Sequence, residues 1–379
     1  MSAPTATGAS ATGLPGQSSG SSPGQSPARD LVMAVPGDLN TVTGGYAYDR
    51  AVIAHLPAHG WQPSTISLGP GFPAPTSQTL DAAMAGLAQI QGDQPLIIDG
   101  LAYGVLPADR LQALANPIIA LVHHPLALET GVEAVEAERL RHSEKAALAL
   151  ADAILVTSPH TKRVLIDQFT VPDDKITVAT PGVPLAAEVP VEKASPPLIL
   201  SVGTITRRKG VDLLLRSLAG LQDRAWQAVI CGGREHDPVY AAEIDQLMVT
   251  LGLEDRVHAT GSVSPDVLAD WYAKASFFVL ASHYEGYGMA FAEALRHGLP
   301  VVGFDVGAVP DTVGGGGILL ADGDQRGLQA ALARLLDDSA YFETMVMKAK
   351  DQGRSYPQWS DTAGIVAGCL NRVMEQRDG

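Results

Sequence analysis

The sequence contains few cysteines and few basic residues. Its two cysteines, Cys231 and Cys369, lie far apart among 379 residues. They form no metal-ligand or redox spacing, which is consistent with a reducing compartment. Lysine and arginine number 26 against 41 aspartates and glutamates, giving a formal net charge of −15. This charge provides no overall attraction to nucleic acid or anionic lipid. We therefore expect no nucleic-acid partner, although a local basic cluster can still act in an acidic protein.

Long apolar runs are also absent. No run approaches the roughly 18 to 20 apolar residues that span a bilayer, and no basic start followed by an apolar stretch marks a secretory signal. We therefore expect a cytoplasmic protein. Residues 2–28 consist of Ser, Gly, Pro, Ala, Thr and Gln apart from Leu14. Such a segment buries too little apolar surface to offset its ordering entropy, so we predict a disordered tail over residues 1–28.

From Asp30 onward, short apolar runs alternate with helical patterns over a length sufficient for two domains. In the first half, strands are predicted at 31–35, 64–68, 95–99, 117–122, 153–157 and 175–179, and helices at 45–56, 79–90, 132–150 and 159–169. Because the strands are continuously apolar and alternate with helices, this order predicts a parallel sheet covered by helices on both faces.

Residues 181–197 contain five prolines and no periodicity, which indicates a domain boundary. We place one domain over residues 29–185 and a second over 195–355. A C-terminal segment, 356–379, has a predicted helix at 361–376 that crosses back to the first domain. Second-domain strands are predicted at 198–202, 228–232, 256–260, 276–280, 300–304 and 317–321. The predicted fold class is α/β, with two doubly wound Rossmann-like domains facing across a cleft, where such folds bind ligands.

The segment 282–302 combines two acids with two glycines. A helix is predicted to begin near Gly288, so Glu285 lies in the loop before it and Glu293 lies on it. Gly286 and Gly288 allow a ligand to approach the backbone closely, and the free N–H groups of the first turn favour an anion such as a diphosphate. The alternative is that Glu285 is an ordinary capping or surface acid and that Glu293 faces solvent.

A basic cluster follows the first strand of the second domain. Gly203 comes directly after this strand, and Arg207, Arg208 and Lys209 lie near the start of the next helix. Cations held there suit a pyrophosphate leaving group, whose negative charge grows as a glycosyl bond breaks. A solvated basic loop is the alternative.

Two further features lie in the first domain. Gly44 and Gly45 open its first helix, and His123 and His124 follow a predicted strand directly before Pro125. With the Gly…Lys-Gly turn of the second domain and the two glutamates separated by seven residues, these features resemble the retaining glycosyltransferase family 4, which has the GT-B fold. The resemblance covers the chain from residue 30 to the final helix.

The resemblance implies a role for several side chains. In the first domain, the acceptor side, Gly45 faces the donor phosphate and His123 contacts the transferred sugar. In the second domain Lys209 neutralises the diphosphate, Glu285 holds hydroxyls of the donor sugar, and Glu293 holds the ribose. On this basis His123, Glu285 and Lys209 are the predicted catalytic residues.

The other implied donor contacts come mainly from backbone groups and from the basic turn. They are Gly203, Arg207, Arg208, Val263, Gly286, Tyr287, Gly288 and Met289, with Val263 meeting the base. One position departs from the family pattern, because Thr204 stands where the family usually has an arginine. Arg207 or Arg208 supplies the missing cation, and the sequence does not decide between them.

The donor and acceptor are constrained less strongly. The segment 261–265 lacks an acid to pair with guanine N–H groups, which favours a UDP- or ADP-linked donor over GDP. No Asp-x-Asp suited to a phosphate-bridging cation is present, so we assign no metal ligands and no cofactor. The acceptor hydroxyl could belong to a lipid, a glycan or a small metabolite. Residues 131–150 carry four glutamates against three basic residues, so their charge does not indicate contact with an anionic membrane.

The expected reaction is sugar transfer with retention by a same-face route, without a covalent glutamate intermediate. One alternative is a glycoside hydrolase that uses Glu285 and Glu293 as its acid and nucleophile, although a hydrolase needs no diphosphate clamp. Another is a protein that binds nucleotide sugars without turnover, which the substitution at Thr204 leaves open. A dinucleotide-dependent dehydrogenase is less favoured, because no Gly-x-Gly-x-x-Gly follows the first strand of either domain.

Overall fold

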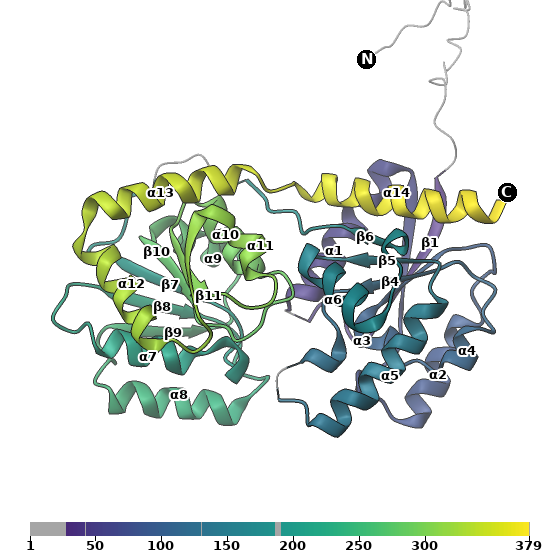
Figure 1. Cartoon of the computed structure of the whole chain (residues 1–379), viewed down its shortest axis with the longest axis horizontal. Coiled ribbons are helices and arrows are strands. Elements are labelled where there is room, and N and C mark those ends of the chain that lie inside the picture. The colour runs from purple at the N-terminus through teal and green to yellow at the C-terminus, as the bar shows by residue number, and fades with distance from the viewer. Residues whose placement is uncertain (1–27, 42, 130, 186–190, 379) are drawn as a thin grey trace, which may run out of the picture.

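The computed structural model describes residues 28–41, 43–129, 131–185 and 191–378. The tail predicted over residues 1–28 lies outside the described residues, apart from Ala28. The described residues form two α/β domains side by side, each with a six-stranded parallel sheet between layers of helices (Figure 1). The predicted fold class is therefore confirmed, and all twelve predicted strands overlap observed ones.

The N-terminal sheet has the strand order β2-β1-β3-β4-β5-β6, and every pairing is parallel. Its strands are β1 (Arg29–Val35), β2 (Trp61–Ser67), β3 (Leu96–Asp99), β4 (Ile118–Val122), β5 (Ala153–Val156) and β6 (Ile176–Val178). Its helices are α1 (Gly44–His55), α2 (Ser77–Leu87), α3 (Gly100–Tyr103), α4 (Ala108–Leu111), α5 (Ala134–Leu150) and α6 (Pro159–Phe169), with 3-10 turns η1 (Leu56–His59), η2 (Leu126–Leu128) and η3 (Asp173–Lys175). The residues of β3, β4 and β5 are buried throughout, as the continuous apolar runs predict.

The C-terminal sheet has the order β12-β11-β10-β7-β8-β9 and is also fully parallel. Its strands are β7 (Leu198–Val202), β8 (Gln227–Cys231), β9 (Val257–Gly261), β10 (Phe277–Leu280), β11 (Val301–Phe304) and β12 (Gly317–Leu320). Its helices are α7 (Val211–Ala219), α8 (Pro238–Thr250), α9 (Pro265–Lys274), α10 (Met289–Arg296), α11 (Val309–Val313), α12 (Gln325–Asp337) and α13 (Ser339–Arg354), with 3-10 turns η4 (Arg207–Lys209) and η5 (Gly314–Gly316). None of the helices described in either domain combines the length and the apolar content that crossing a bilayer requires.

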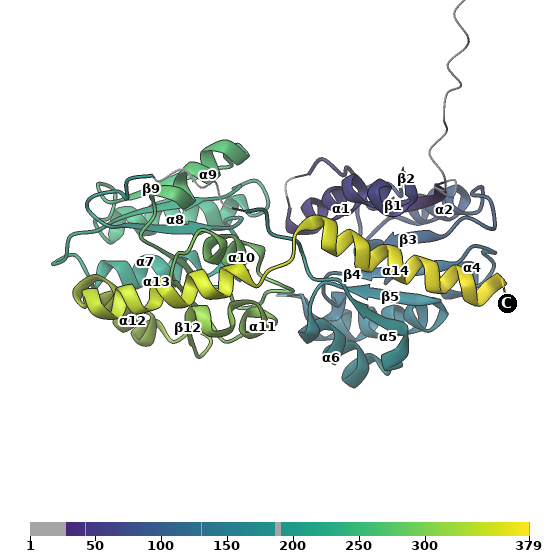
Figure 2. The ribbon, with the colours of Figure 1, turned by 90° about the horizontal axis from the view of Figure 1, so that it is seen from above.

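The last helix, α14 (Trp359–Asp378), belongs to the N-terminal domain although it follows the C-terminal domain in sequence (Figures 1 and 2). Its apolar residues Val366 and Leu370 are buried in one core cluster with Leu31 and Met33 of β1. The chain passes between the domains twice, and the two passages are joined where the backbone N–H of Val183 donates to the carbonyl of Pro357 at 2.8 Å. The final helix thus completes the first domain, as the sequence predicts.

Replacing Leu370 by Ala tests how much the N-terminal domain depends on α14. Leu370 is fully buried, and truncations of this kind cost about 2–5 kcal/mol through lost burial and a residual cavity. We expect L370A to lower the urea concentration at which β1 loses protection, measured by hydrogen exchange with mass spectrometry. The matched control is I365A on the same helix, where the side chain is 39% exposed and the expected change is below about 0.5 kcal/mol. Equal protection of β1 in L370A and the unaltered protein would contradict the prediction.

Candidate active site at the domain junction

Two loops at the carboxyl edge of the C-terminal sheet form the base of the site. The first runs from the end of β7 to Gly210 and contains η4; the second follows β10. Gly210 has φ +59°, and a Cβ there would lie 2.0 Å from the carbonyl oxygen of Ala281, so this position requires glycine. The backbone N–H of His283 donates to the carbonyl of Arg208 at 2.8 Å. The close packing of these loops brings their side chains together.

The main side-chain contact between the loops is the ion pair of Lys209 and Glu285. The Nζ of Lys209 lies 2.6 Å from Oε1 of Glu285, and the hydroxyl of Ser282 donates to the same oxygen at 2.7 Å. Burial alone would raise the pKa of Glu285, but the charges of Lys209 and then Arg208 outweigh it and hold this pKa below its usual value. Glu285 is therefore an ionised, buried carboxylate, and not the surface acid of the alternative interpretation.

The structure decides between the two arginines of the basic turn. The Nη1 of Arg208 lies 3.7 Å from Oε2 of Glu285 and donates to the carbonyl of Tyr284 at 3.0 Å. Arg207 is directed elsewhere: it pairs with Glu243 at 2.8 Å, and its side chain is 63% exposed. Only Arg208 of the two thus contacts the group around Glu285, and the prediction of Arg207 as a donor contact is not supported by its position.

The helix α10 begins at the same loop. Gly288 precedes it with φ +89°, a left-handed conformation that favours glycine. Across the junction α1 also begins with its N-terminus toward this point, since a Cβ on Gly44 would lie 3.8 Å from the sulfur of Met289. Two helix N-termini, each with free N–H groups and a positive dipole end, therefore lie close together. This arrangement suits an anion between the domains.

Glu293 lies on α10, beyond the loop that carries Glu285, and it has a different hydrogen-bond partner. Its Oε2 accepts a hydrogen bond from the hydroxyl of Tyr272 at 2.8 Å. Burial raises the pKa of Glu293, and the hydrogen bond from Tyr272 only partly offsets this. Tyr272 comes from α9, and nothing in the sequence marked it. The two glutamates thus have opposite environments, one paired with cations and the other with a phenol.

The other predicted backbone contacts lie around these side chains. A Cβ on Gly203 would lie 3.3 Å from the Cδ of Lys209, so this glycine lets the lysine side chain pass. The carbonyl of Tyr287 accepts a hydrogen bond from Thr312, which fixes the loop before α10. Val263 is partly buried against the core of the C-terminal domain, and none of the described contacts joins it to the ion-paired group.

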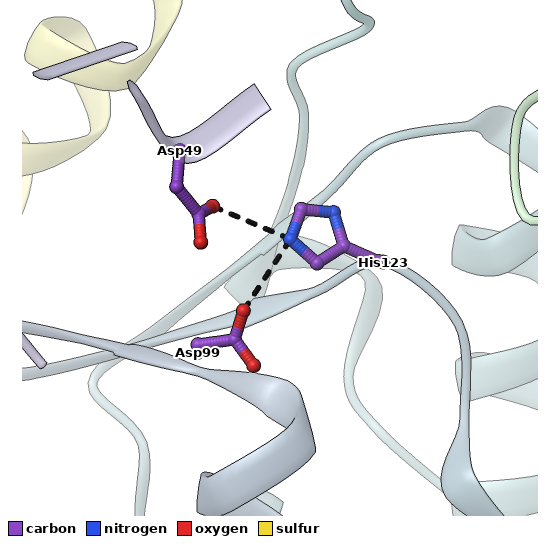
Figure 3. Close-up of side chains that lie close together, drawn as sticks. All are labelled: Asp49, Asp99 and His123. Atoms are coloured by element: carbon purple, nitrogen blue, oxygen red, sulfur yellow. Dashed lines mark ion pairs between the residues drawn. The ribbon is translucent and has the colours of Figure 1, made fainter. Parts of the chain in front are cut away.

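The first domain contributes His123, which follows β4 directly. Its Nε2 lies 3.3 Å from Oδ1 of Asp49 and 3.5 Å from Oδ2 of Asp99 (Figure 3). A Cβ on Gly45 would lie 3.3 Å from Cδ2 of the His123 ring, so the helix α1 starts against the imidazole. The ring of Tyr48 contacts it edge to face, with centroids 5.4 Å apart. Gly45 and His123, which the sequence analysis assigned to the donor phosphate and the transferred sugar, therefore lie side by side.

Sequence reasoning missed both aspartates. Asp49 lies one helical turn beyond Gly45 on α1, and Asp99 is the last residue of β3, which pairs with β4 in the sheet. The rule that neighbouring parallel strands end at the same edge could have identified Asp99 beside His123. Among the described residues, the ligand atoms of Asp49, Asp99 and His123 lie within 4.8 Å of one another, close enough to hold a cation. The search for an Asp-x-Asp motif does not detect such a group, because its members are far apart in sequence.

Two contacts of the C-terminal domain with the N-terminal domain lie around this site. A Cβ on Gly286 would lie 2.6 Å from the carbonyl oxygen of His123. The Nε of Arg208 lies 3.3 Å from Glu129, beside the imidazole of His124. These contacts bring the predicted residues of the two domains to one junction.

Replacing Gly286 by Ala tests whether this junction closes as described. Because the added methyl would overlap the carbonyl of His123, we expect G286A to hold the domains apart. The measurement is small-angle X-ray scattering, with an increased radius of gyration expected, together with faster hydrogen exchange in residues 123–126. The control is G315A, since a Cβ on Gly315 meets nothing within 4 Å. Identical scattering from G286A and G315A would show that the junction does not depend on this contact.

Comparison with known proteins places this geometry in a family. A family model described as Glycosyltransferase Family 4 matches residues 50–187, and one described as Glycosyl transferases group 1 matches residues 196–338. A relative named MMP alpha-(1->4)-mannosyltransferase, from Mycolicibacterium hassiacum, is 29% identical over 286 residues, covering 70% of this chain and 67% of its own. A D-inositol 3-phosphate glycosyltransferase from Thermobispora bispora is 28% identical, covering 62% of this chain and 59% of its own. The chain therefore matches only about three fifths to two thirds of the length of these relatives.

Solved structures share the fold over nearly the whole chain. A sucrose-phosphate synthase from Thermosynechococcus elongatus has a TM-score of 0.77 at 22% identity, covering 92% of this chain and 100% of its own. HepE from Anabaena in complex with UDP-glucose has a TM-score of 0.69 at 17% identity, covering 90% and 100%. The first domain matches the Glycosyltransferase Family 4 model and the second domain matches the Glycosyl transferases group 1 model. The two domains are arranged as in these solved structures. The chain belongs to glycosyltransferase family 4, a family of sugar-transferring enzymes with the GT-B fold.

Proposed function

We propose that the protein transfers a sugar from a nucleoside-diphosphate sugar to an acceptor hydroxyl, with retention at the anomeric carbon and without a metal ion. The observation that carries this proposal is the group formed by Lys209, Arg208 and Glu285 beside two helix N-termini. A hydrolase needs no such combination, because water attack on a glycoside produces no diphosphate. The family membership of the chain also disfavours the hydrolase alternative.

The diphosphate is bound between the starts of α1 and α10 in this proposal. Free N–H groups at both helix N-termini direct partial positive charge toward it. Lys209 and Arg208 supply full charges on the side of the C-terminal domain. Negative charge on the diphosphate increases as the glycosyl bond breaks, so these groups stabilise the transition state more than the bound donor.

Glu285 holds the transferred sugar. Its Oε1 already accepts hydrogen bonds from Lys209 and Ser282, whereas Oε2 has only the longer contact with Arg208. Because the carboxylate is ionised, this second oxygen can accept strong hydrogen bonds from sugar hydroxyls. Glu293, with its hydrogen-bonded Tyr272, is placed to bind the ribose farther along α10.

The reaction follows a same-face course. The bond between the anomeric carbon and the diphosphate oxygen breaks, and the acceptor oxygen bonds to that carbon on the face that the diphosphate leaves. The acceptor proton passes to the departing phosphate oxygen, so no protein base is required. Neither glutamate forms a covalent bond, which agrees with the pairing of Glu285 to Lys209.

The donor nucleotide is UDP or ADP in this proposal. Val263 and its neighbours offer no acid to guanine, and structures of similar fold have been determined with UDP and UDP-glucose bound. The acceptor is a molecule with a free hydroxyl, such as a lipid, a glycan or a small metabolite. Inositol 3-phosphate occurs in the name of one relative and another is named a mannosyltransferase, so small polyols and sugar derivatives are the first acceptors to test.

A donor panel tests the proposed function. We expect the purified protein with EDTA to hydrolyse one UDP- or ADP-sugar slowly without acceptor, with nucleoside diphosphate release followed by mass spectrometry. Lys209→Ala should reduce this rate by about 10² to 10³, because it removes a charge from the leaving group, and Glu285→Ala should reduce it similarly. Binding of a nucleotide sugar with no release in any condition would favour a binding protein without turnover. Loss of activity in EDTA that Mg²⁺ or Mn²⁺ restores would contradict metal independence.

The two arginines of the basic turn provide a matched pair of variants. R208A should lower the rate of donor cleavage by about tenfold or more, because Arg208 contacts Glu285 and faces the proposed diphosphate. R207A should retain the activity of the unaltered protein, because Arg207 pairs with Glu243 on the surface. Steady-state kinetics with the identified donor measure both. Equal losses in the two variants would show that the turn acts as a diffuse basic patch, and not through Arg208.

A further inference from the structure

The buried acids beside His123 are not used by the reaction proposed above. Asp49 is fully buried, and neither of its carboxylate oxygens makes a hydrogen bond to the described residues. Asp99 is also buried, and its Oδ1 accepts from the backbone N–H of Leu101 at 2.7 Å while its Oδ2 faces His123. Two carboxylates thus converge on one imidazole nitrogen from α1 and from the end of β3 (Figure 3).

Charge balance indicates the protonation state of the group formed by Asp49, Asp99 and His123. Among the described residues, neither Asp49 nor Asp99 pairs with a lysine or an arginine, and His123 is the only basic group within ion-pair distance of either. A buried carboxylate without a compensating charge is strongly unfavourable. A proton on the imidazole offsets one of the two negative charges without any additional group, and burial together with the charge of Asp99 raises the pKa of Asp49 to about 6.

We propose that Asp49 and Asp99 are positioning residues that keep His123 as an imidazolium, with its Nε2–H shared between them and its Nδ1–H left to donate toward the donor sugar. The part that concerns the sugar rests on the proposed function, whereas the charge state is a property of the free protein. Because the Nε2–H is shared between two carboxylates, Nε2 makes no straight hydrogen bond to either acid.

The exposure of the ring agrees with this division of its nitrogens. The side chain of His123 is 21% exposed, yet Nε2 itself is buried, so the exposed atoms lie elsewhere on the ring. Nδ1 lies on the side away from both carboxylates in Figure 3. A neutral ring with its proton on Nε2 would present an acceptor there, whereas an imidazolium presents a donor. The acids therefore decide which hydrogen bond the site offers.

The surrounding groups reinforce the charge. Burial alone would lower the pKa of His123, but the neighbouring carboxylates of Asp49 and then Asp99 raise it to about 10. Tyr46 and Tyr48 on α1 are the nearby phenols, and burial raises the pKa of each above its usual value, so both remain neutral.

The remaining charged groups at the junction are engaged elsewhere. His124, next in the chain, pairs with Glu129 at 2.7 Å. Lys209 and Arg208 of the opposing domain are directed to Glu285. No other group of the described chain competes for Nε2, so removing either aspartate should act directly on His123.

Nuclear magnetic resonance of the free protein tests the charge state without any donor. The protein has ten histidines, so the His123 imidazole signals are assigned by their loss in H123Q. We expect these signals to remain those of an imidazolium from pH 6 to pH 8.5. In D49N, and in D99N, they should titrate near the ordinary histidine pKa of about 6.5. The control D81N alters a surface aspartate that pairs with Arg110 and should leave them unchanged.

Two results would overturn the proposal. One is titration of His123 near pH 6.5 in the unaltered protein. The other is a shift of its signals when EDTA is added or when Zn²⁺ is titrated in, which would show that the three ligand atoms hold a cation. The amide oxygen introduced by D99N can still accept the hydrogen bond that caps α3, so we expect this variant to fold. If D99N and D49N give the same titration, the D49N result does not arise from misfolding. Hydrogen exchange in β3 and β4 confirms that each variant is folded.

Kinetics then connect the charge to the reaction. With the identified donor, kcat of D49N should fall on the alkaline side with a midpoint near pH 6.5, where the unaltered protein shows no such loss. A change of KM alone, without a new midpoint, would mean that the acids act only in packing. If the magnetic resonance results hold but no variant or unaltered protein cleaves any donor, the proposed function fails and the charge assignment stands.

Discussion

The buried contact between Lys209 and Glu285 is the interaction on which the site in the second domain depends. It joins the loop after β7 to the loop after β10, and both loops are shaped by glycines that exclude a side chain. A Cβ on Gly307 would lie 2.4 Å from the carbonyl of Glu285, just as one on Gly210 would meet Ala281. Removing one partner of a buried pair leaves an uncompensated charge, which costs more than the pair itself contributes. The loops therefore hold one arrangement, and the donor groups are positioned before any ligand arrives.

The two sides of the junction have opposite electrostatic character. The C-terminal domain presents Lys209 and Arg208, whereas the N-terminal domain presents the acids Asp49 and Asp99 around one histidine. A diphosphate is attracted by the cations of the first side and by the N-terminus of α1, and it is disfavoured by the buried acids of the second side. A sugar, with its many hydroxyls, suits the second side, because carboxylates and an imidazolium offer both acceptors and donors. In the proposed reaction the C-terminal domain thus holds the donor through Lys209, Arg208 and Glu285, and His123 of the N-terminal domain meets the transferred sugar from the opposite side.

The sequence was sufficient for the strands and for placing Lys209 and Glu285 in loops after strands of the second domain, because both follow from periodicity and from the rule that ligands meet the carboxyl ends of parallel strands. It could not separate Arg207 from Arg208, since adjacent residues of a 3-10 turn point in different directions and only the packed structure shows which one faces inward. Asp49 and Tyr272 were missed for a related reason: each lies on a helix whose rotation about its axis the hydrophobic pattern defines only coarsely. Asp99, at a strand end, was within reach of the same rule that identified His123.

The contacts between the domains differ in strength from those within each site. At the hinge, backbone hydrogen bonds and the guanidinium of Arg296, which donates to the carbonyls of Val183 and Tyr356, join the two chain passages. Elsewhere between the domains, the link between Arg163 and Asp311 is a partly exposed ion pair, worth only about 0–1 kcal/mol. Separating the domains breaks this pair together with the contacts of Arg208 and Gly286 with the first domain, while Lys209 and Glu285 stay together because they belong to one domain. In the proposed reaction a donor thus enters a preformed C-terminal site, and closure then brings the imidazole of His123 to a sugar that is already held.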